Sequence, residues 1–74
     1  MNTIEVVKSI VSHKTPVEDL TEDSLLLSLG LNSLDLVEIT LEIEDAFHIN
    51  FTSSEILNLK TIKDLVTLID RKRQ

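Results

Sequence analysis

Two serines, Ser24 and Ser33, each follow an acidic or amide residue and precede a leucine, and each could be a point of chemistry. A serine hydroxyl acts as a nucleophile when a neighbouring base takes its proton, and the usual base is a histidine. The chain holds two histidines, His13 and His48, and no motif ties either of them to a serine. We therefore predict no catalytic residue and no enzymatic activity. Any reaction at a serine would be driven by another enzyme.

The stretch that begins at Ser33 predicts a long helix over residues 33–47. It contains no Gly or Pro, and Asn32 with Asp35 three residues later fits the pattern of a helix cap. Alternating apolar and polar residues over 37–44 would also fit a half-buried strand, but residues 46–47 break the alternation. The helix is therefore the preferred interpretation.

A serine at the first turn of a long helix suits the attachment of a phosphate. The free N–H groups and the positive end of the helix dipole both favour a negatively charged group there. Ser24 lies only six residues before Gly30, so it would start a turn too short for a comparable dipole, and we interpret it as a cap. Position alone favours capping for Ser33 as well, because serine is common at helix starts.

On a helical wheel, residues 33–47 separate into three stripes. The expected core face is formed by Leu36, Ile39, Ile43 and Phe47. An acidic stripe about opposite is formed by Asp35, Glu38, Glu42 and Asp45. A second apolar strip, on the far side of the acids, is formed by Leu34, Val37 and Leu41. A helix that only has to fold needs one apolar stripe, so the second is either further core or an exposed docking surface.

Composition indicates one small domain over residues 1–74 that packs without cross-links. With 42% hydrophobic residues and no cysteine, neither a disulfide nor a thiolate metal site is possible, and we predict no metal site. Residues 32–58 carry six acids and no base, which argues against nucleic acid. On charge alone, basic protein partners and a merely solvated face both stay open. No stretch approaches the ~20 apolar residues of a membrane span, so we expect a cytoplasmic protein that does not enter a membrane.

The remaining elements predict an all-α fold, a small four-helix bundle with three longer helices and a short third helix. The first helix would cover residues 2–11, with Asn2 and Glu5 as a capping box. The short helix would cover residues 53–59 and begin at one of the serines at 53 and 54. The last helix would begin after Thr61 and present an apolar face of Ile62, Leu65, Val66 and Ile69, and the basic residues at 71–73 would complement its dipole.

A long loop is expected between the first and second helices. Residues 14–32 hold the only Pro and the only Gly of the chain, with one short turn over residues 24–29. A loop of this length without structure would be unusual, so we expect leucines to hold it against the core. These are Leu20, Leu25, Leu27 and Leu29.

The stretch LGLNSLDLVEITLEIEDAF, followed by TIKDLVTLI, resembles the acyl carrier protein family. The signature of that family is L-G-x-D-S-L before an acidic helix, and the resemblance covers most of the chain. It implies that Ser33 carries a 4'-phosphopantetheine arm, which a phosphopantetheinyl transferase takes from coenzyme A. The thiol of the arm would hold acyl groups as thioesters. Ser24 has the literal D-S-L but lacks the acidic helix, so it is interpreted as a decoy.

The same resemblance implies which residues meet partner enzymes. Basic patches on the transferase and on acyl-loading and acyl-processing enzymes would bind to Leu34, Asp35, Val37, Glu38, Leu41, Glu44 and Asp45. The core, where a growing acyl chain could be sheltered, would be lined by Leu36, Ile39, Ile43, Phe51, Leu59, Leu65 and Ile69. The protein would be a monomer that presents acyl groups to fatty-acid, polyketide or related biosynthetic enzymes.

Three departures from the family pattern favour a specialised stand-alone carrier over the housekeeping one. Asn32 replaces the usual Asp, Ser28 stands where Asp is frequent, and residues 48–59 lack the Pro and the acid cluster of fatty-acid carriers. Two alternatives stay open. One is an aminoacyl (peptidyl) carrier of nonribosomal assembly, against which the acidic second helix argues. The other is an unmodified helical adaptor that has lost the arm, for which Asn32 is the best argument.

Overall fold

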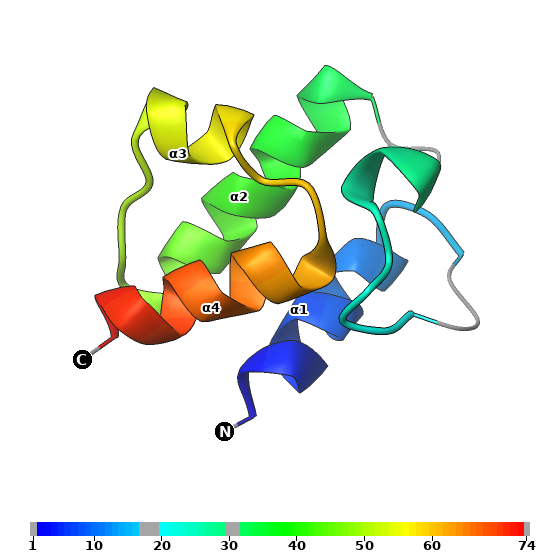
Figure 1. The fold of residues 1–74 in the computed structure, drawn as a ribbon. Helices are drawn as coiled ribbons and strands as arrows, with labels where there is room; N and C mark the ends of the chain where they lie inside the picture. The colour runs from blue at the N-terminus through cyan, green and yellow to red at the C-terminus, as the bar shows by residue number, and fades with distance from the viewer. Residues whose placement is uncertain (1, 17–19, 30–31, 74) are drawn as a thin grey trace.

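Four α-helices and one short 3-10 turn make up the computed structural model, which describes residues 2–16, 20–29 and 32–73 (Figure 1). The helices are α1 (Thr3–Ser12), α2 (Ser33–Phe47), α3 (Ser53–Leu57) and α4 (Ile62–Lys72), and the turn is η1 (Leu26–Leu29). Within the described ranges there is no β-strand, only an isolated bridge between Leu25 and Thr61. The predicted all-α fold, with a short third helix and a long loop after the first, is confirmed. None of these helices is long and apolar enough to cross a membrane, a finding that concerns the described residues alone.

Three of the helices begin with a reciprocal capping pair. In each pair the cap side chain accepts a backbone N–H three residues later, and the side chain of that later residue accepts the N–H of the cap. The pairs are Asn32 with Asp35, Thr52 with Glu55, and Thr61 with Asp64. The predicted caps of α2 and α4 are therefore confirmed, and both helices begin where the sequence places them.

Two other predicted caps are wrong in detail. The cap of α3 is Thr52 and not one of the two serines that follow, because only Thr52 has Glu55 three residues later to complete the pair. Asn2 does cap α1, but its side-chain oxygen accepts the N–H of Ile4 at 3.0 Å. The hydrogen bonds of the described residues give Glu5 no part in that cap.

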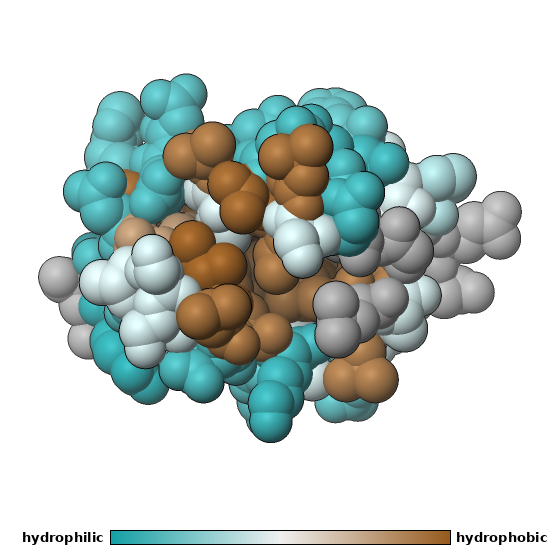
Figure 2. Space-filling view, turned by 90° about the horizontal axis from the view of Figure 1, so that it is seen from above, coloured by the Kyte–Doolittle hydropathy of each residue, from teal (hydrophilic) through white to brown (hydrophobic). Residues whose placement is uncertain are grey.

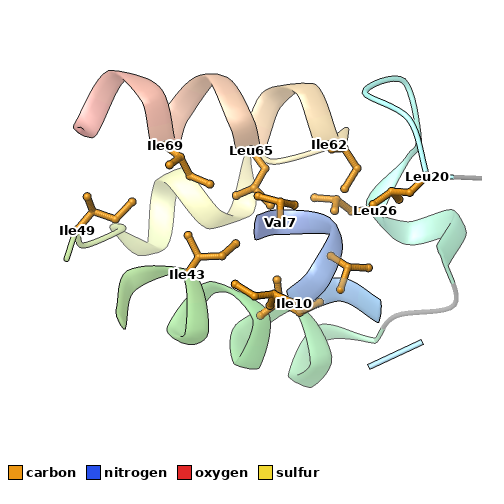
Figure 3. Packing of buried hydrophobic residues seen from close by; sticks show 11 residues of the cluster. Val7, Ile10, Leu20, Leu26, Ile43, Ile49, Ile62, Leu65 and Ile69 are labelled. Atoms are coloured by element: carbon orange, nitrogen blue, oxygen red, sulfur yellow. The ribbon is translucent and has the colours of Figure 1, made fainter. Parts of the chain in front are cut away.

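The core lies between α2 and α4, with α1 packed against both (Figure 3). Leu65 and Ile69 of α4 point toward Ile43 of α2, and Val7 of α1 lies between the two helices. The buried set is Val7, Ile10, Val11, Leu20, Leu26, Ile39, Ile43, Ile49, Ile62, Leu65 and Ile69. Each such side chain contributes about 1.5–3 kcal/mol when fully buried. On the predicted core face of α2, Ile39 and Ile43 are fully buried as predicted, but Leu36 and Phe47 are only partly buried. Two further predicted core residues outside α2, Phe51 and Leu59, are also only partly buried.

The long loop is held against the core by a different set of leucines from the predicted one. Leu20 and Leu26 are buried and Leu29 is partly buried, but Leu25 is 53% exposed. Next to Leu25 the chain pairs with the segment before α4: Leu26 N–H donates to the Lys60 carbonyl at 2.8 Å. The chain enters the turn η1 directly after this pairing, and in this arrangement Leu26 faces the core while Leu25 faces solvent. The side chain of Leu27 lies outside the described part of the structure.

The start of α1 and the end of α4 meet in a small polar network. The Thr3 hydroxyl donates to Asp70 Oδ1 at 2.6 Å and accepts from Arg73 Nη1 at 3.0 Å. The Arg73 guanidinium also lies 4.8 Å from the ring centroid of Phe47. Arg71 and Lys72 occupy the last turn of α4, as predicted for bases that complement the helix dipole. The basic tail therefore joins the first, second and last helices as well.

Candidate functional site

Ser33 is the first residue of α2, and it is exposed. The residue before it, Asn32, is the helix cap: its side-chain oxygen accepts the Asp35 N–H at 2.8 Å, and Asp35 Oδ2 accepts the Asn32 N–H at 3.3 Å. Because Asn32 and Asp35 form the cap between them, the hydroxyl of Ser33 is not needed for it. The structure therefore leaves this hydroxyl free for another role.

The backbone around Ser33 fits a phosphate group. Of the first four N–H groups of α2, that of Asp35 donates to the cap side chain and that of Leu36 donates to the Asn32 carbonyl at 3.1 Å. Among the described residues no acceptor is assigned to the N–H groups of Ser33 and Leu34. Two N–H groups without an acceptor in the described part of the chain, at the positive end of a 15-residue helix, are suited to a phosphodiester on the neighbouring hydroxyl.

Ser24 has a local structural role instead. It is partly buried, its hydroxyl accepts the Thr21 N–H at 3.0 Å, and its own N–H donates to the Thr21 carbonyl at 3.1 Å. Its carbonyl accepts the N–H of Ile62 at 3.0 Å. The serine of the literal D-S-L motif thus closes a turn and joins the loop to α4. It sits at no helix N-terminus, so it lacks the donors that a phosphate would need.

The second apolar strip of α2 is exposed. Leu34 is 65% exposed, Val37 43% and Leu41 57%, whereas Ile39 on the core side has no exposure. The question that the sequence left open is therefore decided: this strip is not further core. In the view from above, hydrophobic side chains gather on the surface around a hollow in the middle of the face (Figure 2). Leu57 of α3 adds to the exposed hydrophobic surface at 84% exposure.

The acidic residues of α2 are not equivalent. Glu38 Oε2 lies 2.6 Å from Lys14 Nζ, and Asp35 is part of the helix cap. Glu44 Oε2 accepts the N–H of Phe51 at 2.7 Å, which fixes the segment between α2 and α3. Asp45, in contrast, is exposed and has no ion-pair or hydrogen-bond partner among the described residues. Four acids are predicted to meet partners, and within residues 2–16, 20–29 and 32–73 only the carboxylate of Asp45 makes no hydrogen bond or ion pair.

Glu42, which the predicted partner set leaves out, is like Asp45 exposed and without a described ion pair. Both acids also border an open groove of about 460 Å³ between α1 and α2. The acidic stripe seen on the helical wheel already contains Glu42, so that pattern was the signal for it. No comparable signal existed for Lys14, which is 24 residues from Glu38 in the sequence.

Comparison with known proteins assigns the chain to a family. The family described as "Phosphopantetheine attachment site" matches residues 5–69. The chain belongs to the acyl carrier protein family. An acyl carrier protein of Helicobacter hepaticus is 33% identical over 76 aligned residues, which cover 99% of this chain and 100% of the relative. An acyl carrier protein homolog of Mycoplasmopsis pulmonis is 42% identical over 53 residues, which cover 72% of this chain and 73% of the relative.

The fold agrees with this membership. A crystal structure of an acyl carrier protein from Thermotoga maritima superposes with a TM-score of 0.82 at 25% identity, covering 97% of this chain and 91% of the other. The chain is therefore an acyl carrier protein, and its cofactor is a covalently attached 4'-phosphopantetheine, as predicted. When bound, this group supplies the thiol on which acyl groups are carried. Proteins of this family interact with a phosphopantetheinyl transferase and with biosynthetic enzymes.

Proposed function

We propose that Ser33 is the residue to which the 4'-phosphopantetheine arm is attached. The observation that carries this proposal is the exposed Ser33 hydroxyl at the first position of α2, next to two N–H groups without a described acceptor. The chain would contribute no catalytic group of its own. Its part would be to present the hydroxyl, to stabilise the phosphodiester at the helix start, and to bind the enzymes that load and process the acyl group.

We further propose that the exposed side of α2 is the surface on which these enzymes dock. The proposed contacts are Leu34, Asp35, Val37, Glu38, Leu41, Glu44 and Asp45. The exposed apolar strip would supply the contact area, and the acids would steer basic patches of the partner toward it. Asp45 and the neighbouring Glu42 carry most of this steering in our proposal, because both carboxylates are exposed and have no ion-pair partner among the described residues.

The broader setting is proposed on the same basis. We regard residues 1–74 as one carrier domain, a monomer in the cytoplasm without enzymatic activity. It would be a specialised stand-alone carrier for fatty-acid, polyketide or related pathways, because Asn32 and residues 48–59 depart from the pattern of fatty-acid carriers. The aminoacyl carrier and the unmodified adaptor are not favoured. Asn32 caps α2 as an aspartate would, so its presence is no argument for a lost arm.

The attachment site is tested by intact-mass measurement. The wild-type chain, Ser24→Ala and Ser33→Ala are each incubated with coenzyme A and a broad-specificity phosphopantetheinyl transferase. We expect the wild type and Ser24→Ala to gain one arm and Ser33→Ala to gain none. Circular dichroism should show all three to be equally helical, because the side-chain hydrogen bond of Ser24 lies in the loop and Ser33 is exposed. A modified Ser33→Ala variant, or a wild type that also stays unmodified with its cognate transferase, would refute the proposal.

The docking surface is tested by the rate of the same reaction. Reversing the charge at Asp45 with Asp45→Lys should lower kcat/KM for modification several-fold and flatten its dependence on salt, because a rim charge acts mainly on association. Asp23→Lys is the matched control, since it reverses an exposed acid of the loop. Equal effects of the two substitutions would mean that only net charge matters and that α2 is not the steering surface.

A further inference from the structure

One acid of the stripe is already occupied by a cation from the chain itself. Lys14 Nζ lies 2.6 Å from Glu38 Oε2, with the two side chains 25% and 43% exposed. The hydrogen bond to Glu38, together with the charges of Glu42 and Asp35, raises the pKa of Lys14 above its ordinary value. The ammonium group therefore sits within the field of three acids of α2, next to the helix that begins with Ser33.

The backbone holds Lys14 in this position. Its N–H donates to the Val11 carbonyl at 3.0 Å, and the N–H of Thr15 donates to the same carbonyl at 3.1 Å. The Thr15 hydroxyl in turn donates to the Leu29 carbonyl at 3.1 Å, four residues before Ser33. A lysine whose backbone is fixed on both sides loses less conformational entropy when it forms an ion pair than one on a free loop. This pair is thus better placed than an average surface contact.

We propose that Lys14 is an internal competitor for Glu38, which a basic side chain of the partner must displace before it can bind that carboxylate. The proposal rests on the proposed function of α2 as the docking surface. Its occupant is a lysine or arginine side chain of the partner, because the chain itself shows that Glu38 accepts an ammonium group at hydrogen-bond distance. Lys14 would therefore lower the affinity of the stripe and restrict it to partners that offer a stronger cation.

The expected effect is modest and has a definite sign. Exposed ion pairs of this kind have strengths that correspond to about 1.5- to 5-fold in an equilibrium constant. Removal of the Lys14 charge should therefore strengthen partner binding by up to that factor. If Lys14 served only to hold the loop, its removal would weaken binding or leave it unchanged. The two roles thus predict opposite directions.

The experiment uses the full chain in two assays. The first measures kcat/KM for modification by the transferase, and the second measures binding of a fluorescently labelled oligo-arginine peptide by anisotropy. We expect Lys14→Gln to raise both by about 1.5- to 5-fold. Lys14→Arg, which keeps the charge, should behave like the wild type. Lys63→Gln removes one exposed charge from α4 and is the control for net charge, so it should raise both by less.

A double-mutant cycle decides whether the effect passes through Glu38. In a Glu38→Gln background, Lys14→Gln should no longer raise either quantity. An equal gain in both backgrounds, or no gain in the wild-type background, would overturn the proposal. Failure of the proposed docking surface looks different: Asp45→Lys and Asp23→Lys would then change the modification rate equally, while the peptide assay would still report on the competition at Glu38. A lower helicity of Lys14→Gln by circular dichroism would assign the lysine to structure and also count against competition.

Discussion

The two buried threonines allow a sharp test of what closes the bundle. Thr3 is 8% exposed and bridges Asp70 and Arg73, whereas Thr40 is 1% exposed and donates only to the Val37 carbonyl of its own helix, at 2.8 Å. Valine has nearly the shape of threonine without the hydroxyl. Thr3→Val and Thr40→Val therefore each remove a hydroxyl group from a buried position. The main difference between the two substitutions is the set of hydrogen-bond partners that the hydroxyl loses.

Thr3→Val should destabilise the fold by about 1–2 kcal/mol. It removes two hydrogen bonds to charged groups, which contribute about 1.5–3 kcal/mol each in general. We discount the two together to about 1–2 kcal/mol because Asp70 and Arg73 are exposed and regain water. Thr40→Val should cost less than about 0.5 kcal/mol or stabilise, since a hydroxyl bonded back into its own helix adds little. For a chain of this size the Thr3 effect corresponds to a Tm lower by about 4–16 °C.

The assay is thermal and urea unfolding followed by circular dichroism at 222 nm, a wavelength at which α-helices give a strong negative signal. The two variants are compared with the wild type under one buffer condition. A Thr3→Val variant that loses no more stability than Thr40→Val would show that the contact between the chain ends does not stabilise the fold. It would also mean that α1 and α4 are held together by apolar packing and not by this polar network.

Two further predictions concern the helix ends. His48 ends α2 with φ 57° and is exposed, so His48→Gly should stabilise the fold by about 0.5–1 kcal/mol. The matched variant His13→Gly, at the right-handed end of α1, should destabilise the fold by a similar amount. Unfolding curves measure both effects, and a loss of stability in His48→Gly would contradict the first prediction. The backbone N–H of Thr52 lowers the pKa of Glu55 and that of Thr61 lowers the pKa of Asp64. The contribution of these two carboxylates to the free energy of unfolding is therefore present at pH values above their ordinary pKa values of 4.5 and 3.8, and it is lost as the pH falls through their lower pKa values in the folded state. The stability of the wild type should drop more steeply in that acid range than the stability of a Glu55→Gln, Asp64→Asn double variant. Equal slopes of stability against pH would contradict this prediction.

The elements that the sequence predicted well are those specified by neighbouring residues. The limits of α2 follow from the cap at Asn32 with Asp35 and from the absence of a turn residue up to Phe47, and all of these signals lie within a few residues of the ends. The start of α4 follows in the same way from its cap. The exposed Ser33 hydroxyl could likewise be predicted, because it depends on a position in one helix and not on the packing of others.

Contacts between distant segments could not be predicted in this way. The exchange of Leu25 for Leu26 in the core depends on the pairing with the residues before α4, which no local pattern reveals. The hydrogen bond from Phe51 to Glu44 and the ion pair of Lys14 with Glu38 also join separate elements. These two contacts matter for function, because they engage two of the carboxylates, Glu44 and Glu38, that the predicted partner set treats as equivalent.

The uneven use of these acids gives the proposed docking surface a direction along α2. Asp35, Glu38 and Glu44 are engaged within the chain, so the carboxylates left without a described partner, Glu42 and Asp45, lie in the second half of α2. Asp45 is twelve residues after Ser33, which is about 18 Å along the helix. The exposed apolar strip lies between these two ends. An enzyme steered by the acids and seated on the strip would therefore approach with its basic patch about 18 Å from the attachment point. Charge changes at Asp45 should then alter the rate of association while leaving the reaction at Ser33 itself unaffected.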